Sequence, residues 1–224
     1  METILFYTPG TCSLAGIIAL EWLGEPFHLC RVEKEDRSTP AYLRINPRAQ
    51  VPALRVDGKP LVEANAILSH IAGRRPDGSL LPRGPGPEAD LGNQWLAYLG
   101  SGFHPVFWPY FAPQKYTTDP NAEPSVRDAA VQAIRRELTV VNAHLEHRPF
   151  VLGETRSVLD GYLHAMDRWA NKIVDMPKEF PSVFAHQKAM AKDPGTRFGM
   201  AIERGDGAVP PSSAFLGHVA LSDT

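Results

Sequence analysis

A strand, a turn and a helix near the N-terminus constrain the fold more than any other stretch of the chain. Thr3–Tyr7 combines β-branched, apolar and aromatic residues, which predicts a strand. Pro9 and Gly10 break the chain after it, and Thr11 is the expected N-cap of a helix. Apolar residues at spacings of three and four predict that helix: Leu14, Ile17, Ile18 and Trp22. Cys12 is therefore expected in the first turn of a helix, at the carboxyl end of a strand.

The expected position of Cys12 has a chemical consequence. The first N–H groups of a helix lack partners within the helix, and the helix dipole adds partial positive charge there. Both stabilise an anion, which is either the thiolate of Cys12 or a thiolate supplied by a ligand. The hydroxyl of Ser13 is a further donor to the same anion. We therefore expect a lowered pKa for the Cys12 thiol, and the alternative is that Cys12 is a small buried packing residue.

The composition indicates a soluble globular protein. The chain has 224 residues, of which 43% are hydrophobic and 21% charged, and its formal net charge is −2. This balance gives no general attraction to nucleic acid or to an anionic membrane. Two cysteines, Cys12 and Cys30, cannot form a disulfide framework, which favours a reducing compartment. Met1 leads directly into the first strand and no apolar run is long enough to span a bilayer, so we expect a cytoplasmic protein.

The first part of the chain alternates strands and helices. Residues 27–32 resemble a second strand that follows a helical crossover, which predicts a βαβ unit with parallel strands. Cys30 lies within that strand and is expected to be structural. Residues 53–56 and 60–62 form two further strands around Asp57-Gly58, a strong hairpin signal, and a helix follows to about Gly73.

The second part of the chain is expected to be helical. Residues 75–87 are rich in proline and glycine and form the linker that ends a first domain at residue 74. Helical periodicity dominates residues 88–205, and the chain ends in a Gly/Pro/Ser-rich tail, 206–224, which either stays a tail or docks as a flap. Within the helical part, Ser157 and Asp160 have the spacing of a capping box, in which each side chain accepts an N–H from the other end of the turn.

Four segments in this order resemble the signature segments of the cytosolic glutathione S-transferases. They are residues 7–14 (YTPGTCSL), 46–54 (NPRAQVPAL), 61–64 (LVEA) and 153–160 (GETRSVLD). The Cys-Ser-Leu turn, together with His104, is most similar to the bacterial beta class. The resemblance implies an α/β plus all-α architecture: an N-terminal thioredoxin-like βαβ-ββα domain that binds glutathione, and a C-terminal helical bundle. It also implies a homodimer.

The same resemblance implies the catalytic residues. Cys12 matches the cysteine beside the glutathione sulfur, Ser13 the neighbouring hydroxyl, and His104 a histidine near the thiol. Lys34 or Arg37 is implied as the partner of the glycyl carboxylate, and the sequence does not choose between them.

The remaining binding residues are carried over from the second and third segments. A cis bond before Pro52 would expose the Val51 backbone to the cysteinyl part of glutathione. Glu63 would face the γ-glutamyl ammonium, while the helix start at Ala64 would bind the γ-glutamyl carboxylate, because the serine common there is absent. The full implied set is Gln50, Val51, Pro52, Glu63, Ala64 and Asn65.

Two classes of function follow. The first is an enzyme of detoxification type, which uses glutathione as co-substrate and no metal. It transfers the thiolate to a small electrophile or exchanges it with a mixed disulfide through Cys12. The second is a non-catalytic glutathione-binding or subunit-interaction module on the same fold. The segment 103–111 is expected to line the apolar substrate pocket, and it does not name the electrophile.

Overall fold

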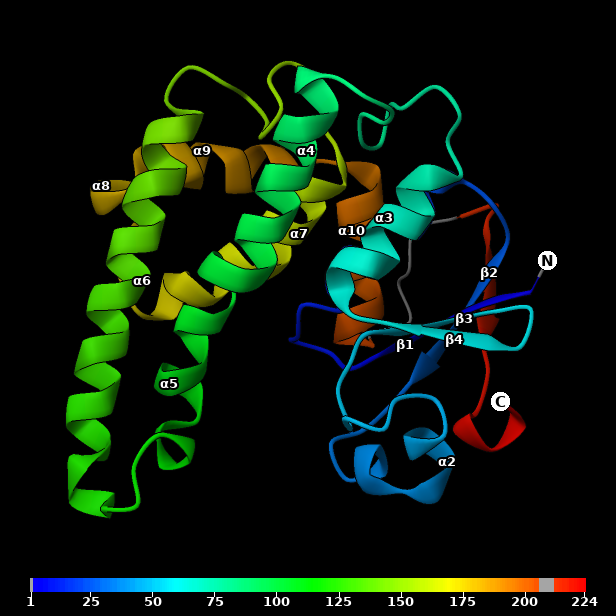
Figure 1. Ribbon diagram of the computed structural model, residues 1–224, viewed down its shortest axis with the longest axis horizontal. Coiled ribbons are helices and arrows are strands. Elements are labelled where there is room, and N and C mark those ends of the chain that lie inside the picture. Colours follow the sequence, from blue (N-terminus) through cyan, green and yellow to red (C-terminus); the bar gives the residue numbers. More distant parts are fainter. Residues whose placement is uncertain (1, 206–211) are drawn as a thin grey trace.

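The computed structural model describes residues 2–205 and 212–224 and shows a sheet domain beside a helical domain (Figure 1). The sheet domain contains β1 (Thr3–Tyr7), α1 (Leu14–Leu23), β2 (Phe27–Arg31), α2 (Pro40–Leu43), β3 (Ala53–Val56), β4 (Lys59–Val62) and α3 (Ala64–Gly73). The helical domain contains α4 (Pro87–Tyr98), α5 (Trp108–Phe111), α6 (Glu123–Leu145), α7 (Val158–Asp167), α8 (Met176–Glu179), α9 (Pro181–Met190) and α10 (Pro194–Arg204). None of the helices in the described residues has both the length and the apolar character needed to cross a membrane.

The sheet has the strand order β4-β3-β1-β2-β5, in which β5 is Phe215–His218. β1 and β2 are parallel, and β3 and β4 form an antiparallel hairpin. These pairings confirm the predicted βαβ unit and the hairpin at Asp57-Gly58. The arrangement is the predicted thioredoxin-like sheet domain with one additional strand.

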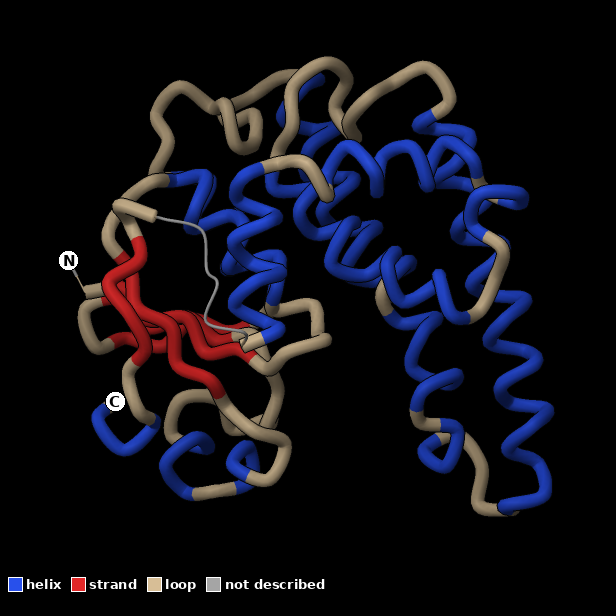
Figure 2. Tube along the Cα trace, turned by 180° about the vertical axis from the view of Figure 1, so that it is seen from behind, coloured by secondary structure: helices blue, strands red, loops and turns tan. Residues whose placement is uncertain are grey.

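Alternating side chains place the sheet between two apolar layers. Leu5 and Tyr7 of β1 face the large core that includes α1, α3 and the helical domain, whereas Ile4 and Phe6 face a smaller core under α2. Cys30 belongs to the smaller core and is fully buried, which fits the expected structural role. The second view shows α2 apart from the helices of the large core, on the other side of the sheet (Figure 2).

The two domains meet where α1 packs against α7 and α10. Gly199 of α10 allows this close approach, because a Cβ there would lie 2.8 Å from Cδ1 of Leu14. Leu14 is the first residue of α1, so α10 packs directly beneath the turn that carries Cys12. The position of that turn therefore depends on both domains.

The expected C-terminal tail contributes the fifth strand. β5 pairs in parallel with β2, and the Phe215 ring packs against Phe27 and Phe198. Inside the sheet, the Tyr7 hydroxyl and Nε2 of His218 are 3.1 Å apart. Residues 206–211 of the expected tail lie outside the described residues. Of the two expectations for the tail, docking holds for residues 214–219, which bond to β2 and its flanking residues. The strand itself was not predicted, because Gly217 lies in the middle of β5 and glycine is uncommon within strands.

The predicted capping box is present at the start of α7. The Ser157 hydroxyl accepts from the Leu159 N–H at 3.3 Å, and Oδ2 of Asp160 accepts from the Ser157 N–H at 2.7 Å. Oδ1 of Asp160 also accepts from the Val151 N–H at 2.8 Å and lies 3.1 Å from Nε2 of His186. One buried carboxylate thus joins α7, α9 and the preceding loop.

His186 makes stability depend on pH. Burial lowers its pKa, but the hydrogen bond to Asp160 and the Asp167 carboxylate, 3.9 Å from Nδ1, outweigh burial and raise the pKa to about 9. Because an unfolded histidine has a pKa of about 6.5, the folded state holds the proton more tightly, and this contribution is complete below about pH 6.5. We expect the free energy of unfolding to fall by up to about 3 kcal/mol as pH rises from 6.5 to 9. Urea unfolding at several pH values measures this slope, and His186→Gln should flatten it.

Candidate active site

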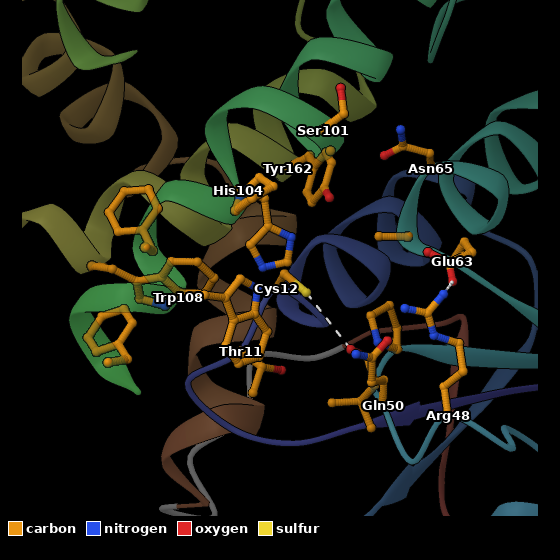
Figure 3. A pocket seen from close by; sticks show the side chains of 18 of the residues that line it. Thr11, Cys12, Arg48, Gln50, Glu63, Asn65, Ser101, His104, Trp108 and Tyr162 are labelled. Carbon is orange, nitrogen blue, oxygen red and sulfur yellow. Dashed lines mark hydrogen bonds and ion pairs between the residues drawn. The ribbon is translucent and has the colours of Figure 1, made fainter. Parts of the chain in front are cut away.

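A cavity of about 690 Å³ lies between the two domains and contains most of the expected site residues (Figure 3). One wall comes from the turn at Cys12, the segment before β3 and the start of α3. The other comes from residues 100–111, which include α5, together with Tyr162 and Trp169. Polar groups gather on the sheet-domain side and aromatic rings on the helical side. The cavity therefore offers a charged half and an apolar half.

Cys12 lies at the junction of these halves, but its helix starts later than predicted. α1 begins at Leu14 with Ser13 at the N-cap position, so Cys12 precedes the helix instead of lying in its first turn. Its Sγ is 3.9 Å from the Val51 carbonyl oxygen, and the residue is only 6% exposed. Burial raises the pKa of the Cys12 thiol to about 12. The expected lowered pKa is therefore wrong, because loss of solvent outweighs the nearby N–H groups and arginines.

Ser13 does not reach the cavity. Its side chain is completely buried, and its hydroxyl bonds to the Thr8 N–H at 3.2 Å, the Thr8 carbonyl at 3.1 Å and Oγ1 of Thr11 at 2.7 Å. Thr11 accepts the Ser13 N–H at 3.3 Å and does not act as the N-cap of α1. The expected role of Ser13 beside a ligand sulfur is not supported, since its hydroxyl stabilises the turn itself.

The helical domain holds the same turn through three side chains that the sequence did not indicate. Arg168 binds Glu203 with two hydrogen bonds, of 2.5 and 3.1 Å, and donates to the Thr11 carbonyl at 3.1 Å. Glu203 accepts the Gly10 N–H at 2.9 Å, and Nε1 of Trp169 donates to the Gly10 carbonyl at 3.0 Å. Gly10 and Thr11, the two residues before Cys12, are thereby held from the opposite domain. No local pattern marks such long-range contacts.

His104 faces the cavity near Cys12 (Figure 3). It follows a π-helical turn, Leu99–Phe103, which extends α4 and reorients the chain. The imidazole packs among the rings of Trp108, Tyr162 and Trp169, at centroid distances of 5.5 to 6.3 Å. Burial lowers the pKa of His104 to about 4, so the ring is neutral at pH 7.

Glu63, Ala64 and Asn65 lie together at the start of α3, as predicted, and all three line the cavity. Glu63 holds an uncommon backbone conformation with φ of +71°, and its largely exposed carboxylate pairs with Arg48 at 3.5 Å. Asn65 donates to the Leu96 carbonyl at 2.9 Å, while its own Oδ1 is buried without a hydrogen-bond partner among the described residues. The Asn65 Oδ1 atom is therefore available to accept a hydrogen bond at this end of the cavity.

Gln50, Val51 and Pro52 also line the cavity, and the Val51–Pro52 bond is cis, as the motif predicted. Two side chains hold the loop that leads to them: the Gln50 carbonyl accepts from the Tyr42 hydroxyl at 2.6 Å and from Nδ2 of Asn46 at 2.7 Å.

The structure distinguishes between the two candidate cations. Arg37 lines the cavity, and its Nε is buried without a hydrogen-bond partner among the described residues. Lys34 is exposed and does not line the cavity. Within the described part of the chain, no three His, Cys, Asp or Glu side chains come close enough together to hold a metal ion.

The aromatic wall lies in the segment expected to form the substrate pocket. Phe107, Trp108 and Phe111 line the cavity, and Trp108 and Phe111 are 42% and 52% exposed. Tyr162 and Trp169 join them from α7 and the turn after it. Neither Tyr162 nor Trp169 is among the residues that the family segments imply.

Comparisons with known proteins agree with this geometry. The family model "Glutathione S-transferase, N-terminal domain" matches residues 1–73. "Glutathione S-transferase GST-4.5" of Xanthomonas campestris is 36% identical over 75% of this chain and 82% of its own length. "Glutathione S-transferase GstA" of Escherichia coli O157:H7 is 31% identical over 89% of this chain and 98% of its own length.

Solved structures extend the likeness to the whole fold. A bacterial beta class glutathione S-transferase of Sphingomonas chungbukensis superposes with a TM-score of 0.79 at 33% identity, covering 89% of this chain and 98% of that one. A sphingomonad glutathione S-transferase complexed with glutathione gives 0.80 at 33% identity, covering 90% and 98%. The expected likeness to the beta class is thereby confirmed, and the chain belongs to the glutathione S-transferase family.

Proposed function

We propose that the large cavity binds glutathione with its sulfur beside Cys12, and that the enzyme transfers this thiolate to a small electrophile. The protein is a glutathione S-transferase by family. The observation that carries the site assignment is the position of Cys12, which lies where the polar half of one cavity meets its aromatic half. A tripeptide in the polar half would present its sulfur toward the aromatic wall.

The polar half matches the charges of glutathione. The Glu63 carboxylate faces the γ-glutamyl ammonium, and the first N–H groups of α3 at Ala64 and Asn65 bind the γ-glutamyl carboxylate. The glycyl carboxylate pairs with Arg37, whose buried Nε needs an acceptor. The Val51 backbone pairs with the cysteinyl peptide unit as an added strand would.

The protonation states favour transfer over exchange. Because the pKa of Cys12 is raised to about 12, Cys12 is a thiol at neutral pH and donates a weak S–H hydrogen bond to the glutathione thiolate. The neutral His104 ring is a second donor close to the same sulfur. Both donors stabilise the thiolate relative to the thiol, which lowers the pKa of bound glutathione. The electrophile then stacks on the wall formed by Phe107, Trp108 and Phe111.

Two assays run side by side test this proposal. One measures conjugation of glutathione to 1-chloro-2,4-dinitrobenzene, and the other measures reduction of a mixed disulfide by glutathione. We expect conjugation at neutral pH, with exchange slower because Cys12 is protonated. Absence of both activities, with glutathione still bound in calorimetry, would favour the non-catalytic binding module instead.

Glu63→Gln should weaken glutathione binding by about 1–2 kcal/mol, because it replaces a charge-assisted hydrogen bond by a neutral one at a position that water still reaches. The Glu63 side chain is 61% exposed, so solvent screens part of the interaction. Isothermal titration calorimetry measures the change. Glu146→Gln, an exposed substitution away from the cavity, is the matched control. Equal affinities for both variants would remove Glu63 from the site.

We further propose a homodimer located in the cytoplasm, as the family resemblance and the two cysteines suggest. Exposed apolar side chains such as Leu91 of α4 and Val140 of α6 support a second subunit. Light scattering at micromolar concentration is expected to give twice the 24.6 kDa mass of the chain. A monomer would contradict the proposal.

A further inference from the structure

A second cavity of about 490 Å³ lies within the helical domain, bordered by α7 and the turn after it, α9 and α10. Four basic side chains line it, and none of its described lining residues is acidic: the four are Arg168, Lys188, Arg197 and Arg204. This concentration of one sign of charge is unusual in a chain whose formal net charge is −2. The cavity shares no lining residue with the one that contains Cys12.

Two of these cations lack a carboxylate partner. Arg168 is neutralised by Glu203. Lys188 and Arg197 are exposed and form no ion pair with any residue of the described chain. Like charges around one hollow repel each other, so a dianion placed between them would be attracted to both. The charge of the site therefore favours a ligand with about two negative charges.

Two buried polar side chains in the lining also lack partners. His164 and Gln187 are each only 6% exposed. Nε2 of Gln187, which is an amide donor, and Nδ1 of His164 have no hydrogen-bond partner among the described residues. Leaving a buried donor unpaired is costly, whereas an oxygen of a bound ligand would satisfy it. These groups distinguish the hollow from a basic surface patch.

The volume of the second cavity and its apolar lining fit a small organic anion better than a bare inorganic ion. Phe184, Ala191 and Met200 supply apolar surface, and Lys188 lies 5.1 Å from the centroid of the Phe184 ring. A cavity of this volume accommodates a small organic molecule. A phosphate monoester carries about −1.5 to −2 charges at pH 7 and three acceptor oxygens, which matches the two unpaired cations and the free donors.

We propose that this second cavity, formed by α7, α9 and α10, binds a phosphate monoester with a small apolar body. The phosphate lies between Lys188 and Arg197, and the apolar body rests on Phe184 and Met200. The proposal is independent of glutathione, because none of these residues lines the first cavity.

Phenyl phosphate is a suitable probe, and Met200 is a reporter within the cavity. Protein labelled with ¹³C at the methionine methyl groups gives a signal for Met200, and buried Met176 in α8, which is not in the lining, is the internal control. We expect a saturable shift of the Met200 signal with phenyl phosphate and weaker binding of inorganic phosphate. Lys188→Gln or Arg197→Gln should each weaken phenyl phosphate about fivefold, and the double variant about 25-fold if the effects add.

Lys192→Gln is the matched control, because Lys192 is an exposed cation just after α9 that does not line the cavity. Its affinity for phenyl phosphate should equal that of the unaltered protein. An equal loss in Lys192→Gln would indicate general electrostatic attraction and overturn the site. A Met200 shift that never saturates, or displacement of the probe by glutathione, would overturn it as well.

Discussion

Replacing Cys12 with alanine should eliminate the glutathione adduct and reduce thiol–disulfide exchange to the uncatalysed rate, while conjugation falls only about fivefold. The exchange reaction requires a protein sulfur that forms a mixed disulfide with glutathione, and Cys12 is the sulfur in the cavity. Conjugation loses one weak hydrogen bond to the glutathione thiolate, worth about 1 kcal/mol. His104 remains in place as the second donor. Mass spectrometry after treatment with oxidised glutathione and the two activity assays measure these outcomes.

The raised pKa of Cys12 adds a pH dependence to the same prediction. Because the pKa is about 12, only a small thiolate fraction exists at neutral pH, and that fraction grows as pH rises. The rate of adduct formation should therefore increase about tenfold per pH unit between pH 7 and 10. Cys30→Ala is the control, because Cys30 is buried in the smaller core under α2 and its removal should leave the profile unchanged. A rate that is already constant at pH 7 would contradict the raised pKa.

The order of strand, turn and helix at the N-terminus could be predicted because the local preferences of most residues there agreed with the fold, although the helix begins at Leu14, later than predicted. The hairpin at Asp57-Gly58 and the capping box at Ser157 were equally local signals. The signals for all three lie within a few residues of each other, which a sequence displays directly. The fifth strand was missed for the opposite reason: β5 is short, contains Gly217, and is stabilised by β2, nearly two hundred residues earlier.

The backbone motifs could be placed on one cavity from the sequence, whereas the effects of burial on their side chains could not. The family segments located Cys12, Glu63, Ala64 and the Val51–Pro52 bond on one cavity. They did not indicate that the Ser13 hydroxyl bonds to Thr8 and Thr11 within its own turn. Nor did they indicate that Cys12 loses solvent, because its burial depends on segments distant in the chain, such as the one at Val51. Desolvation is a property of the folded surroundings, so the direction of the Cys12 pKa shift could not be predicted from its neighbours in sequence.

Asp160→Ala should lower the free energy of unfolding by about 3–5 kcal/mol, the largest stability effect we expect for a single substitution outside the apolar core. The change removes the acceptor for the Ser157 and Val151 N–H groups and the partner of His186. Every residue of α7 is buried, so water cannot replace the lost contacts at this helix start. Urea unfolding at pH 7 measures the effect. Asp128→Ala, an exposed substitution on α6, should change stability by less than about 0.5 kcal/mol.

A comparison with His186 separates the two roles of Asp160. If Asp160 acted only as a helix cap, Asp160→Ala would shift stability equally at pH 6 and pH 9. Because Asp160 also holds the proton on His186, the loss should be larger at pH 6, where the partner histidine is charged, and smaller at pH 9. In a His186→Gln background the Asp160 substitution should lose this pH dependence. The double variant should also lose less unfolding free energy than the sum of the losses in the two single variants. Equal losses at both pH values in both backgrounds would limit Asp160 to capping.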